Sequence, residues 1–128
     1  MIERIFPAGT PKPRGPYTPV IRAGDFVFVS GQGPVDPVTD QMTYGDIQQE
    51  TRLTLNNVKR LLEAAGASLG DVVKVSVFLK DGKDFPAMNE VYREFFDEQR
   101  PTRTTVAVAF ADPLMKIEID CIAYMPAE

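Results

Sequence analysis

The sequence predicts an α+β fold, in which a mixed sheet carries two helices on one of its faces. Short strand-like runs rich in Val, Ile, Phe and Thr are interrupted by two longer segments whose apolar residues recur at helical spacing. The order strand, strand, strand, helix, strand, helix, strand, strand is typical of a mixed sheet with both helices on one side. The other face would then be bare. A bare face rich in Val, Thr and Ala predicts self-association, most simply into a closed ring.

The first three strands are expected near the N-terminus. Ile2 to Phe6 is a short apolar run, and the two runs Pro19 to Arg22 and Phe26 to Ser30 are joined by Ala23-Gly24-Asp25, which predicts a hairpin. The third run opens with continuous apolar residues, so we expect it to be covered on both faces. In Ser30-Gly31-Gln32-Gly33 a plain turn is favoured over an arrangement of backbone amides that binds an anion.

Two helices are expected, from Asp46 to Gly66 and from Asp84 to Phe96. Gly66 ends the first helix, and Asp84 caps the second, which has Pro86 in its first turn. The apolar face of the first helix is formed by Ile47, Leu55, Val58, Leu62 and Ala65. The residues expected away from that face are Gln48, Glu50, Arg52, Lys59 and Glu63. The apolar stripe of the second helix, with Asn89 beside it, is formed by Phe85, Met88, Tyr92 and Phe95.

The strand between the two helices runs from Val72 to Leu79. Side chains alternate along a strand, so its two faces should differ in polarity. One face is expected to carry Val73, Val75, Val77 and Leu79. The other is expected to carry Val72, Lys74, Ser76 and Phe78.

The last two strands carry the main candidate site residues, Arg103 and Glu118. Arg103 shares a face of its strand with the small residues Thr105 and Ala107, and Glu118 shares a face of the next strand with Asp120. The linker between them contains a turn signal, which predicts that the two strands form a hairpin. Whether Arg103 and Glu118 face the same side depends on register, which the sequence leaves open. An arginine in a strand is more often a solvated side chain than a ligand anchor.

Composition bounds the function. The 128 residues fit one domain, and a charged fraction of 25% with a hydrophobic fraction of 44% is that of an ordinary globular protein. The net charge of −4 disfavours nucleic acid as a partner. The chain has no histidine, which removes Ser/His/Asp and Cys/His nucleophile arrangements and His-containing zinc sites. An enzyme of this composition must therefore use carboxylates, hydroxyls, arginine and backbone amides.

The chain is expected to be cytoplasmic. It contains no apolar run near the roughly 20 residues that span a bilayer, and no signal sequence is recognised at its N-terminus, so no membrane partner is expected. The lone Cys121 excludes a disulfide within the chain and fits a reducing compartment. Its place in an alternating strand makes it a small buried hydrophobe.

A set of short motifs resembles the Rid family, also called the YjgF family, over nearly the whole chain and in the right order. The motifs are Gly15-Pro16-Tyr17, Phe26 to Gln32, Asn56-Asn57-Val58 through Gly66, Asp71 to Lys74 with Val77-Phe78, Met88 to Tyr92, Phe95-Phe96, Pro101-Thr102-Arg103 and Ile117-Glu118-Ile119. The resemblance implies that residues 1–128 form a single Rid-family domain with a chorismate-mutase-like fold. In that fold a mixed six-stranded sheet carries two helices on one face, and three subunits close a barrel with their bare faces.

The resemblance also implies an activity. Family members have three equivalent clefts between adjacent subunits. The RidA-like branch hydrolyses 2-imino and enamine acids, such as 2-iminobutanoate and 2-iminopropanoate, to 2-oxo acids and ammonia. No metal or cofactor is required, in keeping with the missing histidine, because an imine is already an electrophile and needs only positioning and general acid/base help.

Site residues follow from the same resemblance. Arg103 resembles the family arginine that holds the substrate carboxylate, and Glu118 resembles the glutamate that orients the attacking water. Five further positions match residues that line the cleft, namely Tyr17, Ser30, Gly31, Asn89 and Thr105. Thr105 stands where many members have cysteine, which puts cysteine-based regulation in doubt.

Other functions stay open from the sequence. One is deamination of a larger substrate such as 2-aminomuconate, for which Arg14 near Tyr17 would be a second cation. Another is a non-enzymatic protein that binds small carboxylates or acts like a chaperone. A third is an RNA-acting translation inhibitor, against which the acidic charge, the missing histidine and the lack of interleaved basic and aromatic residues all argue.

Overall fold

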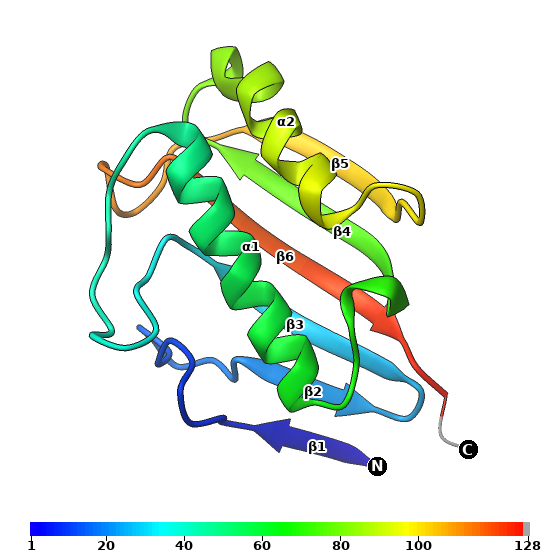
Figure 1. Cartoon of the computed structure of the whole chain (residues 1–128). Helices are drawn as coiled ribbons and strands as arrows, with labels where there is room; N and C mark the ends of the chain where they lie inside the picture. Colours follow the sequence, from blue (N-terminus) through cyan, green and yellow to red (C-terminus); the bar gives the residue numbers. More distant parts are fainter. Residues whose placement is uncertain (127–128) are drawn as a thin grey trace.

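A six-stranded mixed sheet forms the centre of the structure, a computed structural model that describes residues 1–126 (Figure 1). The strands are β1 (Ile2–Ile5), β2 (Val20–Ala23), β3 (Phe26–Gln32), β4 (Val72–Leu79), β5 (Thr102–Ala107) and β6 (Ile117–Tyr124). Their order across the sheet is β1-β2-β3-β6-β4-β5. β4 and β5 are parallel, and every other neighbouring pair is antiparallel. The predicted fold class is confirmed.

Both helices, α1 (Ile47–Ala64) and α2 (Phe85–Phe95), pack on one face of the sheet (Figure 1). Asp46 begins α1 with a capping box, in which its side chain accepts from the Gln49 backbone N–H. Gly66 follows the helix with a φ of +86°, a conformation that favours glycine. Asp84 precedes α2 but makes no side-chain capping bond, so that detail of the prediction is wrong. Neither helix of residues 1–126 is long and apolar enough to cross a membrane.

The core lies between the helices and the sheet. All five apolar residues expected on the inner face of α1 are buried. Glu50, which was expected on the outer face, is fully buried instead. Its carboxylate accepts hydrogen bonds from the backbone N–H groups of Lys116 (2.8 Å) and Gly45 (3.1 Å), and the Lys116 ammonium lies 3.4 Å away. The chain segments around Gly45 and Lys116 therefore enclose this carboxylate and supply its hydrogen-bond donors.

Two strands depart from the alternation expected of them. In β4 the register shifts between Val72 and Lys74, so Val72 is buried and Val73 exposed, the reverse of the expectation. β3 continues to Gln32, with an irregular register between Val29 and Gln32. The glycine-rich segment after Val29 is therefore part of an irregular strand and not a plain turn.

The predicted hairpin between β5 and β6 is wrong, because β4 lies between these two strands. The connection crosses the end of β4, where the Val108 N–H donates to the Leu79 carbonyl and the Lys80 N–H donates to the Lys116 carbonyl. Strands that neighbour each other in sequence need not pair when a third strand offers both of them an edge.

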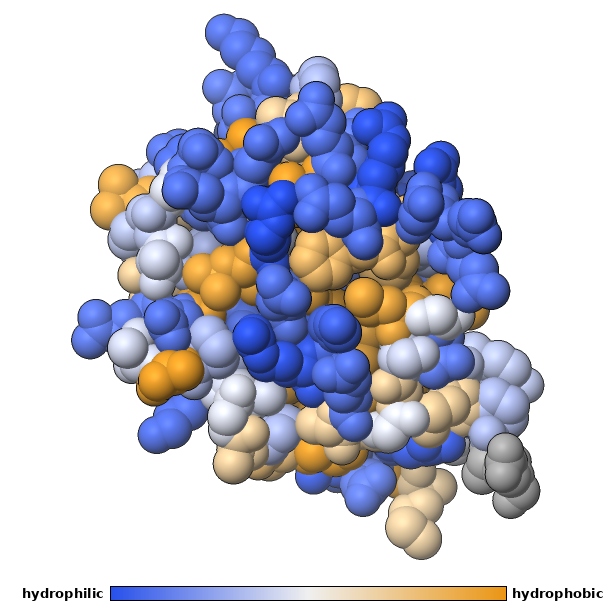
Figure 2. Space-filling model, viewed as in Figure 1, coloured by the Kyte–Doolittle hydropathy of each residue, from blue (hydrophilic) through white to orange (hydrophobic). Residues whose placement is uncertain are grey.

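One face of the sheet carries no helix from the residues that the structure describes (Figure 1). Aromatic side chains gather on this bare face, where the Phe26 and Tyr124 ring centroids are 5.3 Å apart and those of Phe26 and Phe28 are 6.5 Å apart. Phe26 and Phe28 remain more than 40% exposed, so a single chain does not cover β3 on both faces. The opposite side of the molecule is mostly hydrophilic over its helices (Figure 2). The bare face therefore exposes a cluster of large apolar side chains, as self-association requires.

Candidate active site

Glu118 lies in a cleft of about 430 Å³ on the side of the sheet away from the helices. Tyr17, Gly31, Arg14 and Asp112 also line this cleft, which we call the Glu118 cleft. Gly31 passes so close to the carboxylate that a Cβ at this position would lie 2.5 Å from Glu118 Oε2. Only glycine leaves room for the carboxylate in its present position.

The Glu118 carboxyl is half-buried, and burial raises its pKa above the ordinary value, with a smaller contribution from the negative charge of Asp120. Burial also raises the pKa of Asp120, although a hydrogen bond with Ser76 opposes the shift. A carboxyl whose pKa is displaced toward neutral can both accept and donate a proton, which is what general acid/base catalysis requires.

Two other expected residues lie near this cleft. Tyr17 is 42% exposed, and its hydroxyl accepts a hydrogen bond from the Arg14 backbone N–H at 3.1 Å. Ser30 is not part of the cleft lining, and its hydroxyl donates to the Thr18 carbonyl at 2.6 Å. In this chain Ser30 fixes the segment before β2 against β3, which holds Gly31 in place.

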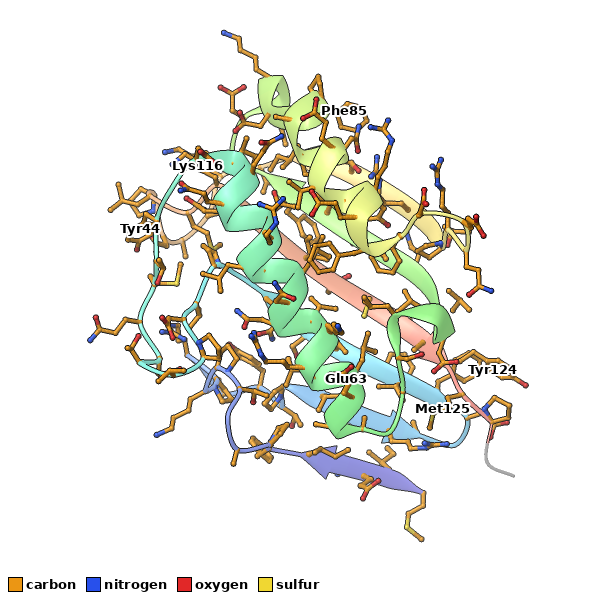
Figure 3. The ribbon with its side chains drawn as sticks, in the orientation of Figure 1. Tyr44, Glu63, Phe85, Lys116, Tyr124 and Met125 are labelled. Carbon is orange, nitrogen blue, oxygen red and sulfur yellow. The ribbon has the colours of Figure 1, made fainter. Side chains whose placement is uncertain are left out.

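The buried Glu50 supports the start of the strand that carries Glu118. It binds the backbone N–H of Lys116, the residue before β6, and Figure 3 shows Lys116 beside the first turns of α1. Tyr44 adds a second tie on this side of the molecule, because its hydroxyl donates to the Asp112 carboxylate at 2.6 Å. This bond lowers the pKa of Asp112 and raises that of Tyr44.

Arg103 lies on the opposite face of the sheet. It pairs with Val75, which is part of the core between sheet and helices, so its side chain points toward α2. The guanidinium carbon is 4.6 Å from the centroid of the Tyr92 ring and 5.5 Å from that of Phe85. Phe85, at the start of α2 in Figure 3, is 42% exposed and was expected in the apolar stripe of that helix. The two rings hold the guanidinium by cation–π contact.

A second, smaller cavity of about 230 Å³ opens beside this guanidinium, and we call it the Arg103 cavity. Asn89 and Tyr92 line it. The Asn89 Oδ1 atom and the Tyr92 hydroxyl are buried without a hydrogen-bond partner among the described residues, as is Thr105 Oγ1 on the same face of β5 as Arg103. Burial raises the pKa of Tyr92, and the charge of Arg103 and the approach of its guanidinium to the Tyr92 hydroxyl oppose that shift, although the two groups form no hydrogen bond of normal geometry.

The expected site residues therefore form two groups. Tyr17, Gly31 and Glu118 meet in the Glu118 cleft, whereas Arg103 and Asn89 meet in the Arg103 cavity. The register question left open by the sequence is settled, because Glu118 pairs with Phe78 on the bare face while Arg103 pairs with Val75 on the helix face. Within one chain the two groups therefore lie in separate cavities on opposite faces of the sheet.

Sequence reasoning missed several residues around Arg103. Arg93 and Arg100 line the Arg103 cavity, and Tyr92 was assigned only to the apolar stripe of its helix. A signal was available for Arg93, which lies one helical turn after Asn89, on the same side of α2. Arg100 lies in the chain just before β5, and no periodic pattern reaches it.

Comparison with known proteins agrees with this fold and with the motifs. A family model described as Endoribonuclease L-PSP matches residues 8–125. A RutC family protein of Pyrococcus horikoshii is 52% identical over 124 residues, which cover 97% of this chain and 98% of that protein. The 3-aminoacrylate deaminase RutC of Acinetobacter baylyi is 43% identical over 123 residues, which cover 96% and 98%.

A solved structure is similarly close. E. coli TdcF with bound serine superimposes with a TM-score of 0.88 at 43% identity, covering 95% of this chain and 98% of that one. The chain therefore belongs to the YjgF-like Rid family, whose model carries the Endoribonuclease L-PSP description. The resemblance found in the sequence is confirmed.

Proposed function

We propose that this protein is a deaminase that hydrolyses small 2-imino acids, such as 2-iminobutanoate and 2-iminopropanoate, to 2-oxo acids. The observation that carries the proposal is the half-buried Glu118 carboxyl with its raised pKa, placed in a cleft against Gly31. A relative that is 43% identical bears the name of a deaminase, which supports the same class of reaction.

The reaction balances with water as the co-reactant. Water adds to the imine carbon, its oxygen forms a new C–O bond, and the C=N bond becomes a C–N single bond. The first proton lost by the water passes to the nitrogen, which gives a carbinolamine with one hydroxyl and one amino group. The hydroxyl proton then passes to the nitrogen as well, ammonia leaves with the C–N bonding electrons, and the carbonyl forms. Glu118 accepts the proton from water and returns it to the nitrogen, for which a pKa displaced toward neutral is favourable.

Arg103 binds the substrate carboxylate in this proposal. Its planar guanidinium can bind a carboxylate with two parallel hydrogen bonds, and the rings of Tyr92 and Phe85 fix its plane. On the same side of the sheet, Asn89 and Thr105 present buried polar atoms that have no partner within residues 1–126, and these can bind the rest of the substrate. Tyr17 and Gly31 line the part of the cleft where Glu118 holds the attacking water, and Ser30 keeps Gly31 in position.

The active unit is a homotrimer in which the Arg103 group of one subunit meets the Glu118 cleft of the next. Two features support this arrangement. Arg103 and Glu118 lie on opposite faces of one sheet, and the bare face exposes the aromatic residues Phe26, Phe28 and Tyr124. A closed ring would bury these rings and complete three equivalent clefts.

The test is the decay of 2-iminopropanoate and 2-iminobutanoate, generated in the assay by an amino-acid oxidase, in the presence of wild type, Arg103→Ala or Lys59→Gln. Lys59 is exposed on α1 and serves as the matched loss of one positive charge. We expect wild type and Lys59→Gln to accelerate decay, and Arg103→Ala to lose about 100-fold in kcat/KM, as expected for a lost charge-assisted pair. Full activity of a trimeric Arg103→Ala would refute the role of Arg103.

The RNA-directed reading implied by the family description is tested beside it. Incubation of the same preparations with single-stranded RNA should leave the RNA intact, because the chain is acidic and has no histidine to serve as base. RNA cleavage by wild type without imine hydrolysis would replace the deaminase proposal. An absence of both, with binding of small 2-oxo acids retained, would instead favour a carboxylate-binding protein.

A further inference from the structure

Three arginines line the Arg103 cavity. Arg93 comes from the last turn of α2, Arg100 from the segment before β5, and Arg103 from β5 itself. No acidic residue of the described part of the chain lines this cavity. The arginine assigned to the substrate carboxylate is therefore accompanied by two further cations, which the proposed reaction does not use.

These arginines have no carboxylate partners within the described chain. The salt bridges of residues 1–126 involve Arg14, Arg52 and Lys116 as cations, and none involves an arginine of the cavity. Arg100 is held by its own turn, because its Nε donates to the Asp97 carbonyl at 2.7 Å. Clustered guanidinium groups without counter-charges repel one another and favour binding of an anion.

The neutral groups of the same cavity point to a ligand as well. The Tyr92 side chain is only 6% exposed, and its hydroxyl lacks a partner among the described residues, as does Asn89 Oδ1. Buried polar atoms without partners are uncommon, because each costs free energy unless water or a ligand satisfies it. The Tyr92 hydroxyl can donate to an oxyanion, and Asn89 Oδ1 can accept from an imine N–H.

We propose that the Arg103 cavity selects 2-imino acids that carry a second carboxylate, with Arg103 binding the first carboxylate and Arg93 and Arg100 binding the second. This inference rests on the proposed function, from which it takes the role of Arg103. It assigns the second cation differently from the sequence-based alternative, which used Arg14. In the structure Arg14 lies 3.7 Å from the Asp40 carboxylate, and Asp112 shares its cleft. The positive charge of Arg14 is thus already balanced by nearby carboxylates. The charges of Arg93 and Arg100 have no such partner among the described residues.

Binding to the full-length protein tests this independently of catalysis. Isothermal titration at fixed ionic strength compares 2-oxoglutarate, with two carboxylates, and 2-oxobutanoate, with one, on wild type, the double variant Arg93→Gln/Arg100→Gln, and Lys59→Gln. We expect wild type and Lys59→Gln to bind 2-oxoglutarate about tenfold more tightly, the effect of two partly exposed charge pairs. The double variant should bind both acids within about twofold of each other, because its loss of affinity falls mainly on 2-oxoglutarate.

Kinetics provides the second readout. In wild type, kcat/KM for 2-iminoglutarate should exceed that for 2-iminobutanoate, and the double variant should lose this preference mainly through KM, since the second carboxylate does not react. Equal affinity of wild type for the two oxo acids, or a preference that survives the double substitution, would overturn the inference.

The two proposals can fail separately. A preference for 2-oxoglutarate that depends on Arg93 and Arg100, without hydrolysis of either imine, would support this anion site and refute the deaminase. Hydrolysis of both imines with equal affinities for the two oxo acids would support the deaminase and refute this inference.

Discussion

The Glu118 cleft and the Arg103 cavity achieve reactivity in opposite ways. At Glu118, partial burial and the nearby charge of Asp120 raise the pKa of a carboxyl that lies against Gly31. At Arg103, aromatic rings orient a guanidinium, and the neighbouring polar atoms have no hydrogen-bond partner among residues 1–126. In the proposed reaction the first region moves a proton and the second holds an anion.

This difference indicates what the functional unit is. A proton-transfer group and an anion anchor are useful to one substrate only if they reach it together, yet the sheet separates them in a single chain. The bare face, with Phe26 and Tyr124 exposed, offers a surface on which a second copy of the chain can bind and contribute the missing half of the site. We therefore expect activity to depend on assembly as strongly as on either residue.

The strongest test mixes two inactive variants. Arg103→Ala and Glu118→Gln, co-expressed with separable tags, should regain activity, because random mixing gives about a quarter of the clefts both intact groups if each cleft spans two subunits. The measurement is imine decay by purified mixed trimers, beside each variant alone. An absence of recovery in mixed trimers would show that one cleft does not combine two subunits.

Gly31→Ala should cause the next largest effect. The added methyl would displace the Glu118 carboxylate, and a shift of about 1 Å at a reacting group can cost up to about 100-fold in rate, so we expect a 10- to 100-fold loss in kcat. Gly82→Ala is the matched control, because a Cβ there meets nothing within 4 Å. Equal activity of the two variants would show that the close approach of Gly31 is unimportant.

Tyr92→Phe should separate stability from binding in the Arg103 cavity. Removing a buried hydroxyl without a partner should raise the free energy of unfolding by about 1 kcal/mol, while binding of 2-oxo acids weakens. Chemical denaturation at fixed subunit concentration and titration calorimetry measure the two effects. A variant that is less stable than wild type would indicate that the hydroxyl already has a partner in the free protein.

Asp120→Asn should produce the smallest effect. The Asp120 charge helps to raise the pKa of Glu118, after burial, so its removal lowers that pKa. If the ionised Glu118 accepts the proton of water, activity falls as pH drops through its pKa, and the variant's acidic limb moves to lower pH. The pH dependence of kcat/KM measures this shift. A move of the acidic limb to higher pH would contradict the assigned effect of the Asp120 charge on the pKa of Glu118.

Local patterns were sufficient to predict most of the fold. The apolar spacing of α1 and its ending at Gly66 follow from helical periodicity and from the conformational freedom of glycine. The failures concern contacts between distant segments. Glu50 fits a solvent-facing position in the helical pattern, and only the folding of residues near 45 and 116 around it explains its burial.

The candidate site shows the same limit. The motifs around Arg103 and Glu118 indicated both residues, but the pairing of β5 and β6 with β4 decides which faces they occupy, and no local pattern encodes that pairing. Arg100 was missed because it enters the cavity from irregular chain.

Thr105 and Cys121 together have a consequence for chemical durability. The only thiol of the chain belongs to Cys121, which is 2% exposed, and burial raises its pKa to about 12. The reactive thiolate is therefore almost absent at neutral pH, and Thr105, whose hydroxyl oxygen is buried, adds no second thiol. Alkylating agents and peroxide have no ready cysteine target in this protein, so we expect it to keep working where oxidases release hydrogen peroxide together with imines.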